Sequence, residues 1–315
     1  MGNTQSTPSV PKDVKYESYK SARNILEKIA LETKGDINVK ANKYEGKLKG
    51  NLKEANFYHP LFTSLGVKKY VPSNPCDLDY IFHTNVLNPK PKDRCPCLLR
   101  DKKRFSNEGE AECGSDKIRD NGERSAGGAC APYRRRHLCD YNLEFINEQN
   151  VLTTHDLLGN VLVTAKYEGA SIVDSYANKG SSEVCTALAR SFADIGDIIR
   201  GKDMFKRTDK DYVENGLKAV FKKIYEGLKN KGANVHYKDD GSGNYYKLRE
   251  AWWTANRDQV WKALTCTAPY GANYYRKYSN NIQDFTSEGK CGHKETERDL
   301  PTNLDYVPQF LRWFD

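Results

Sequence analysis

The sequence predicts a mostly α-helical protein, in which a loop-rich segment stabilised by disulfides is followed by a helical bundle. Six of the nine cysteines lie between positions 76 and 139, among residues that favour turns. From Cys139 onward, apolar residues recur at the three- and four-residue spacing of a buried helix face. Strand-like alternation of apolar and polar residues is almost absent.

Residues 1–72 are expected to form an N-terminal segment with a tail, a helix and a basic arm. The first 15 residues are polar and contain proline, which is typical of a loose tail. A helix follows, with Ser18 or Ser21 available as its N-cap. Its apolar face is formed by Ala22, Ile25, Leu26, Ile29 and Ala30. Residues 34–53 are rich in Lys, Asn and Gly and are interpreted as an extended basic arm.

Residues 73–150 form the second expected unit, which is rich in loops. Because such a segment buries little apolar surface, cross-links must offset part of the entropy that is lost on ordering. Crowded cysteines in this context are typical of a disulfide framework in an oxidising compartment. Zinc is the competing interpretation, but Cys95 and Cys97 lack the second Cys or His pair of a zinc site. The odd number of cysteines leaves one thiol free or paired outside the chain.

Residues 151–315 are expected to form the helical bundle. Gly201, Gly232 and the loop at 239–244 separate its helices. The four apolar stripes that predict these helices are Leu157, Leu158, Val161, Leu162 and Ala165; Leu188, Phe192, Ile195 and Ile199; Leu217, Val220, Phe221, Ile224 and Leu228; and Trp253, Val260, Trp261 and Leu264.

Three tryptophans are expected to serve packing rather than recognition. Trp253 and Trp261 lie eight positions apart on one helical face, and Trp252 is placed at the rim of that face. Trp261 is therefore expected to be a buried aromatic.

No catalytic constellation is present, so the sequence predicts a protein that is not an enzyme. The GxSxG, P-loop, HExxH and dinucleotide-binding motifs are absent, and the six histidines are scattered. No cofactor or metal site is expected. No stretch approaches the ~18 apolar residues of a membrane span, and the first residues lack a secretory signal.

Two alternatives from other classes stay open at this point. The opening MGNTQS fits the N-myristoylation pattern with Gly2 as acceptor, so a cytosolic N-myristoylated peripheral protein without enzymatic activity is one of them. A cysteine hydrolase is the other, because the fold could bring a Cys and a His together. The number of free thiols distinguishes both from a disulfide framework.

The net charge of +8 is concentrated near the N-terminus, where residues 1–60 hold 11 Lys or Arg against 7 Asp or Glu. A positive excess favours polyanionic partners such as nucleic acid, anionic lipid or sulfated glycans, without choosing among them. A solvated surface of mixed charges is the alternative.

The stretch CAPYRRRHLCD, residues 130–140, allows two interpretations. It is either a basic site for an acidic ligand or a cross-linked clasp whose arginines hold the protein together. Arg134, Arg135 and Arg136 are consecutive, so they cannot all face one way. At least one is expected to point inward and pair with a carboxylate or with backbone carbonyls, which favours the clasp.

Four longer motifs follow one another along the chain: CAPYRRRHLCDYNLE at 130–144, ARSFADIGDIIRGKDMF at 189–205, AWWTANRDQVWKALTC at 251–266 and PTNLDYVPQFLRWFD at 301–315. In this order they resemble the signatures of the Duffy-binding-like alpha domain, the head domain of variant erythrocyte membrane proteins of Plasmodium falciparum. The opening MGNTQS is also similar to the start of those proteins. The resemblance implies a Duffy-binding-like fold of the two-cysteine class, with the chain ending before a third subdomain.

The resemblance also implies a function and a location. It implies a non-enzymatic adhesion domain on the extracellular face of the infected erythrocyte, where host antibodies meet it. The implied partners are heparan sulfate, blood-group antigens and complement receptor one or other surface receptors, with rosetting as one outcome. Nucleic acid is not an expected partner.

Under this resemblance, four disulfides are expected. They are Cys76–Cys95, Cys97–Cys139, Cys113–Cys130 and Cys185–Cys266. Cys291 is then left for a partner beyond Asp315. The last of the four pairs would staple the helix that starts near Glu183 to the helix that ends at Cys266.

A site for sulfated glycan is expected on the basic arm together with a basic loop, because spaced cations can follow a linear polyanion. The candidate residues are Lys12, Lys15, Lys20, Lys40, Lys43, Lys47, Lys49, Lys102, Lys103 and Arg104. The alternative is that residues 34–53 wrap back onto acidic residues as a structural strap.

Overall fold

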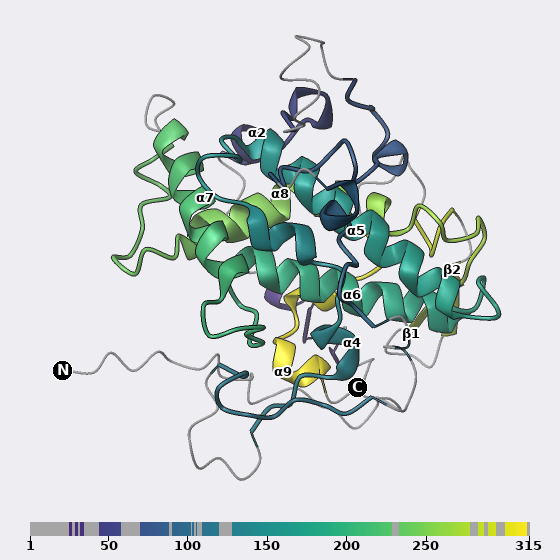
Figure 1. The fold of residues 1–315 in the computed structure, drawn as a ribbon. Coiled ribbons are helices and arrows are strands. Elements are labelled where there is room, and N and C mark those ends of the chain that lie inside the picture. The colour runs from purple at the N-terminus through teal and green to yellow at the C-terminus, as the bar shows by residue number, and fades with distance from the viewer. Residues whose placement is uncertain are drawn as a thin grey trace.

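The computed structural model describes residues 25–26, 29–30, 32–34, 44–57, 70–87, 90–101, 103, 105, 109–119, 128–228, 233–277, 283–286, 289–293 and 300–313. Its body is a bundle of four long helices, α5 (Thr154–Ser175), α6 (Ser182–Arg200), α7 (Tyr212–Leu228) and α8 (Tyr246–Leu264), with shorter elements around them (Figure 1). These helices coincide with the four predicted apolar stripes. None of the helices within these ranges has both the length and the apolar character required to cross a membrane.

Local sequence signals explain where two of these helices begin or end. α5 starts with a capping box, in which the Thr153 side chain accepts a hydrogen bond from Asp156 N–H at 3.2 Å. The Asp156 carboxylate in turn accepts one from Thr153 N–H at 3.0 Å. α6 ends at Gly201, the predicted stop, whose φ of +74° lies in the left-handed region that favours glycine.

Helix α8 packs against α5, α6 and α7 and carries the three tryptophans into the core. Trp252, Trp253 and Trp261 are all fully buried, which confirms their packing role. Trp252 is not at a rim, because it faces α5 and α7 instead. Its Nε1 donates to Thr154 Oγ1 at 2.6 Å, and its ring meets Phe221 edge-on at a centroid distance of 6.1 Å.

The N-terminal segment packs onto α5 and α8. Leu26 and Ala30, on the predicted first helix, are buried, and α2 (Glu45–Leu48) and η2 (Leu52–Glu54) follow. Asn256 of α8 donates from Nδ2 to the Leu48 carbonyl at 3.0 Å and accepts from Gly50 N–H at 2.7 Å. The backbone around residues 48–50 is therefore fixed to the bundle.

The remaining elements are short. The loop-rich stretch contains η3 (Pro75–Asp77), η4 (Pro91–Arg94), α4 (Tyr133–Arg136) and η5 (Tyr141–Phe145). After α8, β1 (Tyr274–Lys277) and β2 (Gln283–Thr286) pair as an antiparallel hairpin, with Tyr274 opposite Thr286. η7 (Leu304–Tyr306) and α9 (Gln309–Arg312) then pack on α6.

Four disulfides cross-link the chain, and two of them are the predicted pairs Cys97–Cys139 and Cys113–Cys130. The other two predicted pairs are wrong. The four cysteines concerned form Cys76–Cys266 and Cys185–Cys291 instead.

The tertiary fold explains this exchange of partners. η3 packs against α8, so Cys76 meets Cys266 near the end of that helix rather than its neighbour in the loops. Cys266 is then not available to Cys185, which bonds to Cys291. Cys291 therefore needs no outside partner. The structure describes all nine cysteines, and the free one is Cys95.

Candidate functional site

The first predicted site is the arginine stretch, which lies between two cross-links, Cys113–Cys130 and Cys97–Cys139. It folds as α4, a single helical turn that begins after Pro132. Consecutive side chains on a helix point about 100° apart, so the three arginines of this turn point in three directions. They cannot form one basic face.

Arg135 points into the protein and is only 2% exposed. Its Nε donates to Asp203 Oδ1 at 3.1 Å, its Nη2 donates to Asp203 Oδ2, and its Nη1 lies 3.4 Å from Asp140 Oδ2. Burial by itself lowers the pKa of Arg135, but the carboxylates of Asp203 and Asp140 outweigh it and raise that pKa above its usual value. Arg135 is therefore a permanently charged internal link.

The two flanking arginines are also bonded within the protein. Arg134 Nη1 donates to Asp194 Oδ2 of α6 at 2.7 Å. Arg136 Nη1 donates to the Glu110 carbonyl at 2.9 Å, and its Nη2 lies 3.9 Å from Glu112. The interpretation of the stretch as a clasp is confirmed.

Asp140, the residue that follows Cys139 of the Cys97–Cys139 disulfide, forms ion pairs with three guanidinium groups. Arg100 lies 2.8 Å from its carboxylate, Arg207 lies 2.9 Å away and Arg135 lies 3.4 Å away. Burial by itself raises the pKa of Asp140, but the charges of Arg207, Arg100 and Arg135 outweigh it and hold the pKa far below its usual range. One carboxylate thus joins three separate stretches of chain.

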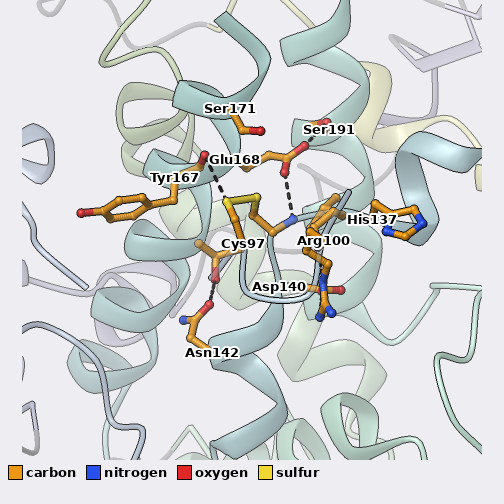
Figure 2. Close-up of a disulfide and its surroundings, with 12 residues drawn as sticks. Cys97, Arg100, His137, Asp140, Asn142, Tyr167, Glu168, Ser171 and Ser191 are labelled. Carbon is orange, nitrogen blue, oxygen red and sulfur yellow. Dashed lines mark hydrogen bonds and ion pairs between the residues drawn. A yellow bond between two sulfur atoms is a disulfide. The ribbon is translucent and has the colours of Figure 1, made fainter. Parts of the chain in front are cut away.

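Figure 2 shows how the other side of this disulfide is held by α5 and α6. Glu168 of α5 is fully buried, and its Oε2 accepts a hydrogen bond from Cys139 N–H at 2.9 Å. Its Oε1 accepts one from Ser191 Oγ of α6 at 2.7 Å. The disulfide is therefore fixed to two helices of the bundle.

The ion pairs around Arg134, Arg135 and Asp140 form a charged cluster, which continues to α9. Arg312 donates from Nη1 to Asp194 Oδ1 at 2.8 Å and from Nη2 to Asp197 Oδ2. Arg200 Nη2 reaches the other oxygen of Asp197 at 2.8 Å. Each carboxylate of this cluster is already bonded to a guanidinium, so its charges connect α6 and α9 inside the fold instead of offering a site for an anion.

The second predicted site, for sulfated glycan, is only partly within the described residues. Lys12, Lys15, Lys20, Lys40, Lys43, Lys102 and Arg104 lie outside them. Lys49 Nζ lies 3.1 Å from Asp258 of α8, and both side chains are solvent-accessible. Lys47 Nζ stands 5.3 Å from the centre of the Tyr44 ring. The Lys49–Asp258 contact shows that the end of the arm also meets the domain.

The structure does not bring Lys103 of the predicted basic loop together with Lys47 and Lys49 of the arm. Lys103 is exposed, and its N–H donates to Asp101, whose other oxygen accepts from Tyr133 of α4 at 2.6 Å. α4 and α2, which carries Lys47, lie on opposite sides of the bundle (Figure 1). The loop and the end of the arm therefore present separate surfaces.

Catalytic and metal chemistry find little support in the described part of the chain. The free thiol of Cys95 is half-buried, and burial raises its pKa, which disfavours a nucleophilic thiolate. In the ranges given above, no group of three or more His, Cys, Asp or Glu side chains is placed to hold a metal ion.

Sequence reasoning missed one feature, a groove of about 690 Å³ between α7 and the segment that follows η5. Its walls come from residues 144–148 and 212–219, together with Leu87. These residues look like an ordinary loop and an ordinary helix surface, and only the tertiary fold joins them. No motif could have indicated the groove.

Two family models match the chain. The Duffy binding domain matches residues 128–312. The N-terminal segments of PfEMP1 match residues 21–56. The two matches together cover the clasp, the bundle and the segment that packs on α8.

Similar structures and curated relatives agree with these matches. The NTS-DBL1-alpha and CIDR-gamma double domain of PfEMP1 from the Plasmodium falciparum varO strain is 54% identical, with a TM-score of 0.86 over 94% of this chain and 43% of that chain. A PfEMP1 DBLbeta domain bound to ICAM-1 is 29% identical, with a TM-score of 0.72 over 92% of this chain and 65% of that chain. The Duffy receptor beta form of Plasmodium knowlesi is 26% identical over 58% of this chain and 14% of its own length. The chain thus spans less than two thirds of each.

Proposed function

The chain belongs to the Duffy binding domain family, and we propose that it is a cell-adhesion domain exposed on the surface of the infected red cell. Domains of this family are non-enzymatic and bind receptors. The observation that carries the proposal is the order of the matches: an N-terminal segment of PfEMP1 and then a Duffy binding domain, as in the similar NTS-DBL1-alpha structure.

The internal construction of the protein supports this role. Four disulfides suit a protein outside the reducing cytosol, which argues against the cytosolic N-myristoylated alternative. The charged cluster and the tryptophans stabilise the fold from inside. Exposed residues can therefore differ between variants, and evade host antibodies, without loss of the fold.

The proposed ligands are host glycans or surface receptors. Heparan sulfate would be bound by the basic arm. Lys47, Lys49 and Lys53 are exposed there, on a chain whose total net charge is +8, and a polyanion is attracted to such a surface. Blood-group antigens and complement receptor one are the other candidates, with rosetting as the cellular outcome. A related DBLbeta domain binds ICAM-1, so the candidates also include a protein receptor of this kind.

A binding panel tests the proposal. The purified chain is measured by surface plasmon resonance against heparin, blood-group trisaccharides, complement receptor one and ICAM-1, and by flow cytometry against red cells and endothelial cells. Saturable binding to at least one is expected. If no cell and no ligand binds while the chain is folded by circular dichroism, the adhesion proposal is wrong.

A further inference from the structure

The groove between α7 and the segment after η5 is built on a rigid floor. Gly216 of α7 lies against the backbone of this segment, since a Cβ at Gly216 would be 2.2 Å from the Ile146 carbonyl oxygen. The two elements thus meet at a distance that only glycine permits. The groove is therefore preformed, and a ligand would bind without first ordering its walls.

Apolar side chains are left open to solvent around this floor. Leu87 and Tyr212 each keep 49% of their surface exposed, and Phe145 is half-buried beside them. Exposed apolar groups that gather at a preformed hollow mark an interaction surface more strongly than isolated ones do.

The charges of the groove disfavour a sulfated glycan. Its lining contains no Lys or Arg, but it contains two carboxylates, Glu144 and Glu148. Glu144 is already paired with Arg100 at 2.7 Å and Arg207 at 3.3 Å. Glu148 is exposed and forms no ion pair with any residue that the structure describes, so it is an open carboxylate that complements a cation.

The amide groups of the groove argue against a neutral sugar. Asn147 Oδ1 already accepts from Gln149 N–H at 2.9 Å, and Asn215 Nδ2 already donates to the Lys210 carbonyl at 2.8 Å. One group of each amide is therefore already used, and most of the surface that the groove leaves open is apolar. The many hydroxyls of a sugar would find few partners on such a surface. A polypeptide with an apolar side chain next to Lys or Arg fits apolar surface beside a carboxylate.

We propose that this groove docks a segment of a host receptor protein that presents an apolar side chain beside a basic residue. The inference rests on the proposed adhesion function and adds a protein-binding surface that is distinct from the basic arm.

The test uses four variants of the full chain. Leu87→Asp and Glu148→Lys change the groove. Val235→Asp and Glu226→Lys make the same kinds of change at exposed positions outside its lining, Val235 being 80% exposed and Glu226 lying on α7. Each is measured by flow cytometry on human red cells and endothelial cells treated with trypsin, or with heparinase and neuraminidase.

The wild type is expected to keep binding to glycosidase-treated cells and to lose it after trypsin. Each groove variant is expected to bind glycosidase-treated cells at least tenfold more weakly, while both control variants bind normally. Elution of the groove variants from heparin should not change, and neither should their melting temperatures. The inference is overturned if groove variants bind like the wild type, or if only glycosidase treatment abolishes wild-type binding. Absence of wild-type binding to every cell would instead contradict the adhesion function itself, and the inference with it.

Discussion

Arg257 and Asp305 form a bidentate ion pair inside the bundle, with contacts of 2.6 and 2.8 Å. Asp305 is fully buried and also accepts from Trp253 Nε1 at 2.8 Å. Burial by itself raises the pKa of Asp305, but the charge of Arg257 and its hydrogen bonds outweigh it and lower that pKa. The pair fixes the segment 300–313 to α8.

Removal of one partner should be strongly destabilising, because it leaves an uncompensated buried charge. Asp305→Ala is expected to lower the free energy of unfolding by about 3–5 kcal/mol. Asp174→Ala, which breaks the exposed 2.8 Å pair with Lys179, should cost less than about 1 kcal/mol. Urea unfolding followed by tryptophan fluorescence measures both. Equal losses would show that burial of the pair does not matter.

Asp140 should make the clasp sensitive to acid. Its pKa is lower in the folded protein than in the unfolded chain, so its stabilising contribution is complete above the unfolded value of ~3.9. That contribution is lost as the pH falls from there through the folded value. Asp140→Asn should therefore be less stable than the wild type at pH 7 by about 3 kcal/mol, and the difference should shrink below pH 4.

Urea midpoints at pH 7, 5, 3.5 and 2.5 test this dependence. Asp209→Asn is a suitable control, because that residue is exposed on the loop before α7. If the stability gap between Asp140→Asn and wild type stayed constant down to pH 2.5, the carboxylate would not carry the acid sensitivity.

Trp261 is one of two tryptophans that pack α8 against Phe192 of α6. It is fully buried, and its ring meets Phe192 edge-on at a centroid distance of 5.2 Å. Trp261→Ala should lower the free energy of unfolding by about 3–5 kcal/mol. A variant that kept its melting temperature but lost cell binding would assign the ring to the ligand instead.

The basic arm can be tested for glycan binding at the loss of one exposed ion pair and one contact with a ring. Lys40, Lys43, Lys47 and Lys49 are replaced together by Ser. Elution from heparin should then require less salt, since four cations are lost. The melting temperature should change little, because the exposed Lys49–Asp258 pair is worth only ~0.2–1 kcal/mol.

The matched control removes a hydrogen-bonding partner of the arm on α8 and keeps all of the lysines. Asn256→Ala leaves Gly50 N–H without its buried partner and the Leu48 carbonyl with Thr154 Oγ1 as the donor that remains, so it should lower the free energy of unfolding by about 1–3 kcal/mol at unchanged heparin elution. If the four-lysine variant eluted like the wild type, the arm would not be part of the glycan site. A large drop in its melting temperature would mark the lysines as structural.

Thiol chemistry tests the cross-links. One free thiol per denatured, unreduced chain is expected, and Cys95→Ser should remove it. Peptide mapping without reduction should recover Cys76 joined to Cys266. Eight or nine reactive thiols would contradict the framework, and Cys76 joined to Cys95 would contradict the fold around η3.

Features encoded over short stretches of sequence were predictable. The four helices follow from apolar spacing within each of them, and the inward direction of one arginine follows from the geometry of one turn. The resemblance also placed Cys97–Cys139 and Cys113–Cys130, both within the loop-rich stretch. The division at residues 72 and 150 stays a prediction.

Features that depend on distant contacts were not predictable. Cys76 meets Cys266 only because η3 packs on α8, and no spacing encodes that contact. Asp203, the carboxylate that Arg135 binds with two of its nitrogens, is likewise 68 positions away. The groove depends on a backbone contact at Gly216, which leaves no periodic pattern.

The two long-range disulfides have a mechanical consequence. Cys76–Cys266 spans 190 positions and Cys185–Cys291 spans 106, and the two loops overlap. Tension applied across positions 76 and 291 passes through the first sulfur bridge and then along only the 25 positions from 266 to 291. At ~3.5 Å per residue, the fully stretched path is about 90 Å, although the linear chain would reach about 750 Å. Force applied between these two positions would therefore act on a short covalent tether, and the helices between the bridges would be spared most of the load.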